Sequence, residues 1–155
     1  EESYPDTLSG EEIPVFIACE KADAYRQTMH SDELIITADT IVWLDGLVMG
    51  KPEDEEDARR MLRCLSGKTH QVITGVCLTT TEFQKSFATV TDVTFAELTE
   101  EEIDYYVQKY KPMDKAGSYG IQEWIGFVGV EGITGSYFNV MGLPIQRLYK
   151  ELKKL

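Results

Sequence analysis

The 155-residue sequence has little of what defines several large classes of protein. No apolar run approaches the roughly 18 residues that a membrane-spanning helix needs, and no charged-then-apolar leader opens it. We therefore expect a soluble protein of the cytoplasm with no membrane partner. The three cysteines are widely spaced and form no Cys-x-x-Cys pair, which speaks against a disulfide framework or a zinc site and favours buried free thiols.

Positive charge is also scarce. The chain has 15 lysines and arginines against 27 aspartates and glutamates, a net charge of −12, which disfavours nucleic acid as a partner. A divalent metal could still bridge acids to a phosphate in a local basic pocket. The common nucleotide cradles are missing, because there is neither a P-loop nor a Gly-x-Gly-x-x-Gly motif. The serines have no evident histidine and acid partners, so triad chemistry is a poor interpretation.

The most informative segment that is present spans residues 34–44, an almost continuous apolar and β-branched run with Asp39 at its middle. Such a run is typical of a strand buried on both faces. A carboxylate there must be hydrogen-bonded, paired or bound to a metal, because an isolated buried charge is very costly. Two interpretations of Asp39 remain open, a structural carboxylate with satisfied hydrogen bonds or a functional one.

Local signals predict the order α-β-β-α-β-β-α-β-α, which indicates one mixed α/β domain. The expected helices run from a Ser9 capping box to about Met29, from Pro52 to Gly67, from a Thr99 capping box to Pro112, and from Leu143 to about Leu152. The expected strands cover 34–44, 47–49, 71–80 and 86–97, with Asp45-Gly46 as a hairpin turn. Residues 114–142 are expected to form glycine-rich loops joined by short strands. In the last helix, Ile145, Leu148, Tyr149 and Leu152 are predicted to face inward.

Three lysines could serve a site with Asp39. Lys21 continues the inward stripe of the first helix, Lys51 stands between a glycine and a proline, and Lys115 lies in a glycine-rich loop. Each alone is more often a solvated surface group. Together with a buried acid, they suggest a phosphate ligand and a divalent cation, with lysines neutralising phosphate and carboxylates holding the metal. Glu131 and Asn139 are further polar candidates, whereas Trp124 could stack on a base or line a loop.

In order and spacing, five groups of residues closely resemble the Maf family of nucleoside triphosphate pyrophosphatases. The residues are Ala38-Asp39-Thr40-Ile41-Val42; Gly50-Lys51-Pro52; Met61-Leu62, Leu65-Ser66-Gly67, His70-Gln71-Val72 and Thr74-Gly75; Asp114-Lys115-Ala116-Gly117-Ser118-Tyr119-Gly120-Ile121-Gln122; and Gly135-Ser136-Tyr137, Asn139-Val140 and Gly142-Leu143-Pro144.

The resemblance implies a mixed α/β fold like that of the inosine triphosphate pyrophosphatases, with two lobes around a cleft. It implies metal-dependent hydrolysis of a nucleoside triphosphate to the monophosphate and pyrophosphate, with Mg²⁺, Mn²⁺ or Co²⁺ as cofactor. Tyr119-Gly120-Ile121-Gln122 resembles the branch that acts on dTTP and UTP, with modified pyrimidine nucleotides as further candidates. The resemblance to this family also suggests a homodimer.

The resemblance also assigns roles to single residues. Asp39 matches the catalytic aspartate, which activates water and holds metal, and Glu2 matches the acid that joins it at the metal. Lys21, Lys51 and Lys115 match phosphate-facing lysines. The substrate-binding set is completed by Thr40, expected to position the metal or water, and by Gln122, expected to contact the edge of the base.

Two departures from the family pattern stand out. Residues 1–155 are expected to form a single Maf-like domain without the family's N-terminal strand and Ser-x-Ser-Pro-Arg-Arg loop, whose serine and arginine grip phosphate. Glu123-Trp124 stand where many relatives carry glycine next to the glutamine, a change expected to influence base preference. The alternative to an enzyme is a nucleotide-binding regulator of cell division and septum formation that acts through a partner.

Overall fold

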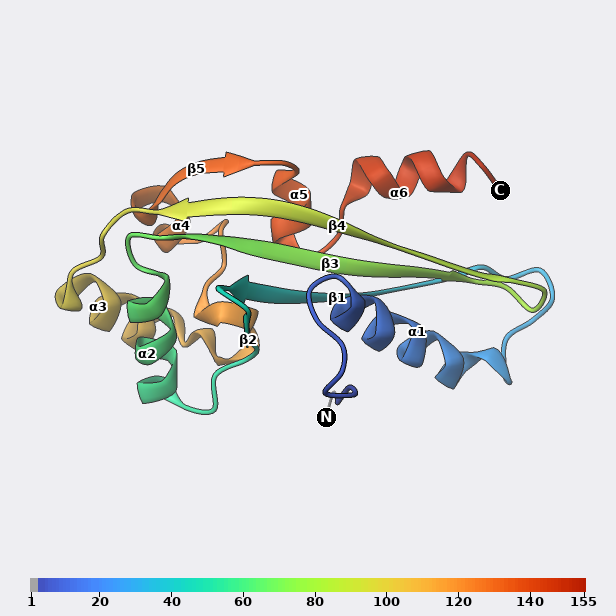
Figure 1. The fold of residues 1–155 in the computed structure, drawn as a ribbon, viewed down its shortest axis with the longest axis horizontal. Helices are drawn as coiled ribbons and strands as arrows, with labels where there is room; N and C mark the ends of the chain where they lie inside the picture. The colour runs from blue at the N-terminus through green and yellow to red at the C-terminus, as the bar shows by residue number, and fades with distance from the viewer. Residues whose placement is uncertain (1–2) are drawn as a thin grey trace.

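A computed structural model describes residues 3–155 of the chain and shows a mixed α/β fold, as the sequence predicts. One antiparallel sheet forms its centre, in the strand order β2-β1-β3-β4-β5 (Figure 1). The strands are β1 (Ile35–Leu44), β2 (Leu47–Met49), β3 (Thr69–Thr79), β4 (Gln84–Phe95) and β5 (Val130–Thr134). The helices are α1 (Glu12–Arg26), α2 (Glu55–Leu65), α3 (Glu100–Tyr110), α4 (Trp124–Gly129), α5 (Tyr137–Met141) and α6 (Ile145–Leu152), with 3-10 turns η1 (Pro112–Asp114) and η2 (Ala116–Ser118).

Strong local signals give the predicted turns and caps. Asp45 and Gly46 both have positive φ, 51° and 84°, as a two-residue hairpin turn requires. At the start of α3, the Thr99 hydroxyl accepts from the Glu102 N–H and the Glu102 carboxylate accepts from the Thr99 N–H, which confirms the capping box. The capping box predicted at Ser9 is wrong. Helix α1 has Glu11 as its N-cap residue without a side-chain cap, because only the Glu12 carboxylate makes its half of the motif.

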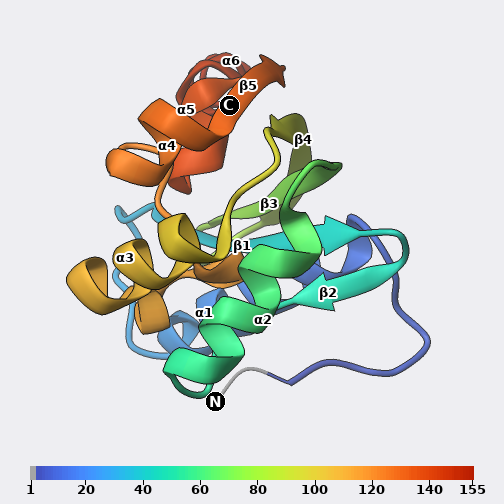
Figure 2. The same cartoon turned by 90° about the vertical axis from the view of Figure 1, so that its left-hand side faces the viewer.

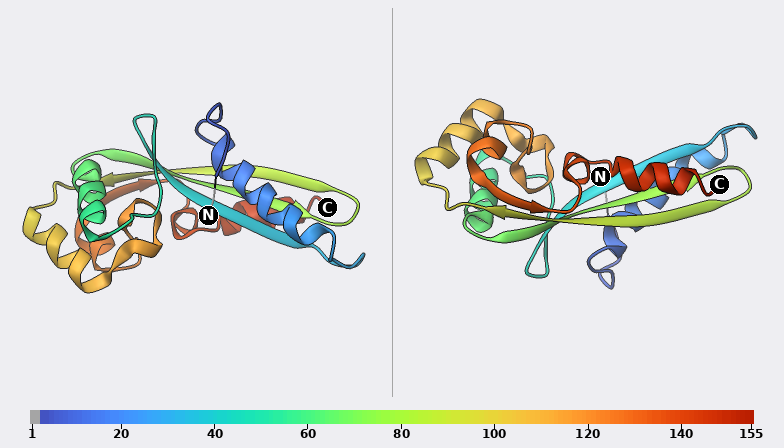
Figure 3. Two further views of the ribbon diagram at one scale, coloured as in Figure 1. Left: turned by 90° about the horizontal axis from the view of Figure 1, so that it is seen from below. Right: turned by 90° about the horizontal axis from the view of Figure 1, so that it is seen from above.

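Helices α1 and α6 cover opposite faces of the sheet. Seen from below, α1 lies in front of the strands, and seen from above, α6 does (Figure 3). The two-residue period of the strands explains this division. One face packs Ile41 and Ile73 against α1, whereas the other packs Val76, Leu78 and Phe87 against Leu148 of α6.

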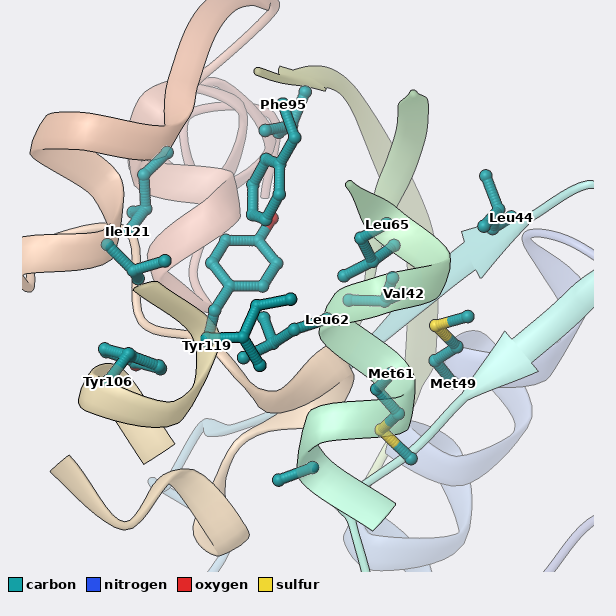
Figure 4. Packing of buried hydrophobic residues seen from close by; sticks show 14 of the residues in the cluster. Val42, Leu44, Met49, Met61, Leu62, Leu65, Phe95, Tyr106, Tyr119 and Ile121 are labelled. Atoms are coloured by element: carbon teal, nitrogen blue, oxygen red, sulfur yellow. The ribbon is translucent and has the colours of Figure 1, made fainter. Parts of the chain in front are cut away.

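The largest core cluster lies at one end of the sheet, beneath α2 and α3. These two helices pack side by side at the end of the sheet (Figure 2). Leu62 and Leu65 of α2 bury their side chains completely in this cluster, and Tyr119 enters it between them and Phe95 (Figure 4). The rings of Tyr119 and Phe95 meet edge to face, with centroids 4.9 Å apart.

A buried hydrogen bond ties this core to the segment after η2. His70, 1% exposed on β3, shares a 2.6 Å hydrogen bond between Nε2 and the Tyr119 hydroxyl. Its Nδ1 is buried and has no hydrogen-bond partner among residues 3–155. Burial lowers the pKa of His70 to about 4. The imidazole is therefore neutral near pH 7.

Two expectations for the C-terminal third are wrong. Residues 114–142 contain the short helices α4 and α5 in addition to strand β5, not only loops and strands. In α6, Leu148 is buried but Ile145 and Tyr149 are 48% and 62% exposed, so they do not face inward. The helix touches the sheet along the side that carries Leu148 and Leu152, and Ile145 and Tyr149 share a different side. No helix within residues 3–155 is long and apolar enough to cross a membrane.

Strand β1 has an open outer edge over most of its length. Its only partner on that side among the described residues is β2, which pairs with Val42, Trp43 and Leu44. The segment before Val42, which contains Asp39, is paired on its inner side alone, with β3. This edge therefore leaves Asp39 within reach of a ligand.

The first prediction concerns the contact between α1 and the sheet. A Cβ atom at Gly75 of β3 would lie 2.4 Å from the backbone of Pro14 and Val15, so α1 would have to move. Gly75→Ala should lower the free energy of unfolding by about 1 to 3 kcal/mol, the usual cost of overpacking a core. Denaturant unfolding measures the loss. Gly132→Ala in β5 is the matched control, because nothing lies within 4 Å of its added methyl group. Equal stability of the two variants would contradict the close contact.

The second prediction follows from the depressed pKa of His70. Between pH 6.5, its ordinary pKa, and about pH 4, the unfolded chain binds a proton that the folded chain does not. Stability should therefore fall as pH drops through this window, by at most about 3 kcal/mol from this residue. His70→Gln should remove that part of the pH dependence in denaturant melts, whereas His30→Gln, at an exposed site, should not. Parallel pH profiles for wild type and His70→Gln would refute this assignment.

Candidate active site

A cleft of about 810 Å³ opens along the free edge of β1. Its walls come from α1, β1, the segment after β2, the η1–η2 region and the end of α5. Six of the seven residues predicted for the site line it, namely Lys21, Asp39, Thr40, Lys51, Lys115 and Gln122. The seventh, Glu2, lies outside the described residues. The structure thus brings together residues from positions 21 to 122 of the sequence.

Asp39 and Lys21 form the floor of the cleft. Asp39 is 8% exposed, and its Oδ1 lies 3.3 Å from the Lys21 Nζ. Lys21 also donates to the Ala38 carbonyl at 3.1 Å. Because Asp39 is opposite Gly75 in the β1–β3 register, its side chain points to the face that α1 covers. The ammonium group compensates for the burial of the carboxylate, so Asp39 can remain charged in a low-dielectric setting.

Lys51, in the segment after β2, and Lys115, between η1 and η2, line the cleft. The Gly117 N–H donates to the Gly50 carbonyl at 3.1 Å and so joins the two lysine-bearing segments. Gly117 has φ +72°, and a Cβ there would lie 2.6 Å from a Val42 methyl group. Only glycine fits this position without strain. The Lys115 Nζ lies 3.2 Å from Asp114 Oδ1, which places an ion pair at the rim of the cleft.

Thr40 belongs to a polar network beneath α5. Its hydroxyl lies 2.8 Å from that of Thr74, which donates to the Asn139 carbonyl. Asn139 is completely buried, and its amide donates to the backbone carbonyls of Val72 and Thr89. Its position indicates that Asn139 fixes α5 to the sheet, which favours a structural role over contact with a ligand. The network also fixes Thr40 at the cleft.

The other polar candidates stand apart from the cleft. Glu131 is exposed on β5, and Trp124 packs edge to face on Tyr105 with ring centroids 4.8 Å apart. Neither lines the cleft. Sequence reasoning missed Tyr119, which lines the cleft and reaches His70 behind it. Both rings of the Tyr119–His70 pair are buried. No local sequence pattern reveals that burial, so the sequence does not predict the pair.

The donor set fits a hard cation. Within residues 3–155, no three acids, histidines or cysteines gather as a metal-binding group. Mg²⁺, however, usually keeps several waters and binds through one or two carboxylates plus substrate phosphates. Asp39 provides a carboxylate that opens to a cleft with room for a polyphosphate. The residues present are therefore compatible with a cation that arrives together with a phosphate ligand.

Comparison with known proteins adds the family. The sequence matches the family described as Maf-like protein over residues 1–155. Relatives named dTTP/UTP pyrophosphatase include one from Phocaeicola vulgatus, 79% identical over 100% of this chain and 80% of its own length. A second, from Bacteroides thetaiotaomicron, is 68% identical over 100% of this chain and 80% of its own. A third, from Porphyromonas gingivalis, is 54% identical over 98% of this chain and 77% of its own. The chain therefore belongs to the Maf family.

Proposed function

We propose that this protein hydrolyses nucleoside triphosphates, with dTTP and UTP as substrates, to the monophosphate and pyrophosphate. The observation that carries the proposal is the single cleft in which a buried carboxylate, three lysines and one amide face the same space. The relatives named dTTP/UTP pyrophosphatase support this substrate class.

In this proposal, Asp39 is the catalytic residue. Its carboxylate accepts a proton from the water that attacks the α-phosphorus, and the bond from that phosphorus to the bridging oxygen breaks to release pyrophosphate. Lys21, 3.3 Å away, stabilises the ionised carboxylate and faces the phosphates. Lys51 and Lys115, from the facing wall, neutralise oxygens of the leaving pyrophosphate.

A divalent cation completes the charge balance. We propose that Asp39 holds it together with Glu2, with Thr40 beside them, and that Mg²⁺, Mn²⁺ or Co²⁺ can serve. When bound, the cation supplies positive charge to the phosphate oxygens. The chain as a whole, with a net charge of −12, offers little general attraction for a polyanion, so local positive charge in the cleft is what such a ligand needs.

Gln122 is the proposed contact to the base. It is exposed and lines the cleft, beyond Lys115 along the same loop. A glutamine amide offers both a donor and an acceptor, which complements the alternating acceptor and donor groups on the pairing edge of uracil and thymine. The amide therefore favours these pyrimidines without the need for a charged contact.

We also propose a homodimer that works in the cytoplasm. Apolar side chains on α5 and α6 remain exposed, and they are Tyr137, Phe138, Met141, Ile145 and Tyr149. Surfaces of this kind commonly mark contacts between proteins. A second copy of the chain is the occupant that the resemblance suggests.

The test of catalysis is pyrophosphate release from dTTP, UTP, CTP and a methylated GTP, with Mg²⁺ or Mn²⁺. We expect release from dTTP and UTP, and its loss when EDTA removes the cation. Asp39→Asn should lower kcat by at least about 100-fold, the lower range for loss of a positioned proton acceptor. Asp45→Asn, in the exposed hairpin turn, is the control that should retain activity. Full activity of Asp39→Asn would contradict the assignment of Asp39 as the catalytic residue. Nucleotide binding without release of pyrophosphate would favour the alternative, a nucleotide-binding regulator that acts through a partner.

The proposed dimer has its own measurement. Sedimentation velocity should give twice the mass of the chain, and Phe138→Asp should shift the protein towards monomer because a buried charge at an interface is costly. Lys154→Asp, near the end of the chain and outside the apolar set, is the control. A monomer at all concentrations would rule the dimer out.

A further inference from the structure

We infer that Tyr106 and Glu123 are positioning residues that link the base-binding turn to the phosphate-facing Lys115. The inference rests on the proposed function, since it explains how that site is held in shape. Neither side chain lines the cleft, so both act through other residues. The turn in question spans residues 120–123 and carries Gln122.

One buried hydroxyl ties both ends of this turn. Tyr106 of α3 is 0% exposed. Its hydroxyl accepts from the Gly120 N–H at 3.1 Å and donates to Glu123 Oε1 at 2.5 Å. The Glu123 N–H donates in addition to the Gly120 carbonyl at 3.0 Å. Gln122 therefore projects from a short loop that is closed through its own backbone and clamped from behind by α3.

The same carboxylate reaches the phosphate side of the site. Glu123 Oε2 lies 3.8 Å from the Lys115 Nζ. The stem of Lys115 crosses over Gly120, where an added Cβ would lie 2.8 Å from Lys115 Cε and 2.9 Å from Glu123 Oε1. Any side chain at position 120 would push the lysine and the carboxylate apart. Glu123 thus joins the turn that holds Gln122 to a lysine that faces the polyphosphate.

The two hydrogen bonds of the Tyr106 hydroxyl, to the Gly120 N–H and to Glu123, form a clamp that is costly to break. Because the Tyr106 hydroxyl is out of reach of solvent, its loss leaves the Gly120 N–H and one oxygen of Glu123 without a partner. Burial and the neighbouring Glu123 also raise the pKa of Tyr106, which keeps the hydroxyl protonated as a donor. The stacked ring of Tyr110, with its centroid 5.0 Å away, holds the phenol in place.

The two partners predict different kinetic effects. Tyr106→Phe releases the turn, so the preference for UTP over GTP in kcat/KM should fall by about three- to tenfold, equivalent to one lost hydrogen bond. Glu123→Gln keeps an acceptor for Tyr106 but removes the charge beside Lys115. It should raise KM for UTP and GTP alike, by about three- to tenfold, while the ratio between them stays near the wild-type value.

Tyr110→Phe is the matched control. It removes a hydroxyl from the same helix, and that hydroxyl makes no hydrogen bond among the described residues. Wild-type selectivity in Tyr110→Phe and reduced selectivity in Tyr106→Phe would support the clamp. Unchanged selectivity in Tyr106→Phe would overturn it, as would a change of the UTP-to-GTP ratio in Glu123→Gln equal to that in Tyr106→Phe. A loss of stability alone would lower the active fraction and leave the ratio unchanged.

Hydrogen–deuterium exchange separates this inference from the proposed function. The Gly120 amide should exchange at least about tenfold faster in Tyr106→Phe than in wild type or Tyr110→Phe, since the hydrogen bond that protects it is gone. If wild type releases no pyrophosphate, the proposed function fails, and exchange still decides whether the hydroxyl holds the turn. Equal exchange in all three proteins would overturn the clamp whatever the activity.

Discussion

Helix α1 approaches β3 so closely at Gly75 that the backbone of Pro14 occupies the space where a side chain would be. This contact sets the height of α1 above the sheet, and Lys21, further along the same helix, is thereby held 3.3 Å from Asp39. Asp39 pairs with Gly75 across the strands, so the residue that admits the helix is also the neighbour of the buried acid. The packing of α1 on the sheet and the placement of the Lys21 ammonium group beside Asp39 therefore both depend on residue 75. A larger residue at 75 would displace the cation that compensates for the burial of Asp39.

The facing wall is held by apolar side chains and by directional bonds. Tyr119 and Ile121 are buried in the core, and backbone hydrogen bonds and buried polar groups fix the loops further. The Gly50 carbonyl binds the Gly117 N–H, and the hydroxyls of Tyr106 and Tyr119 hold the segment that follows. A rigid floor with a wall held by directional bonds suits a site that must accept a charged ligand of defined shape.

The sequence alone predicts the elements whose signals are local. Asp45-Gly46 specifies its hairpin and Thr99 its capping box, because the causes lie within a few residues. Features that depend on long-range packing are not predicted from the sequence. The short helix α4 has no helical period to detect. Ile145 and Tyr149 face outward because α6 packs on the sheet through other residues. The ordered motifs predict Asp39, Thr40, Lys51, Lys115 and Gln122 as site residues, and these line the cleft. Tyr106 has an ordinary core spacing in α3, and only the structure shows that its hydroxyl supports the turn.

Charge explains why lysines of this cleft are paired before any ligand binds. Lys21 contacts Asp39, and Lys115 lies within 4 Å of both Asp114 and Glu123. In a chain of net charge −12, such pairs hold each lysine side chain in one place and reduce the entropy lost when phosphate arrives. The three lysines come from separate segments of the chain and line one cleft. A single phosphate would meet only part of this set, which favours triphosphates over simpler anions.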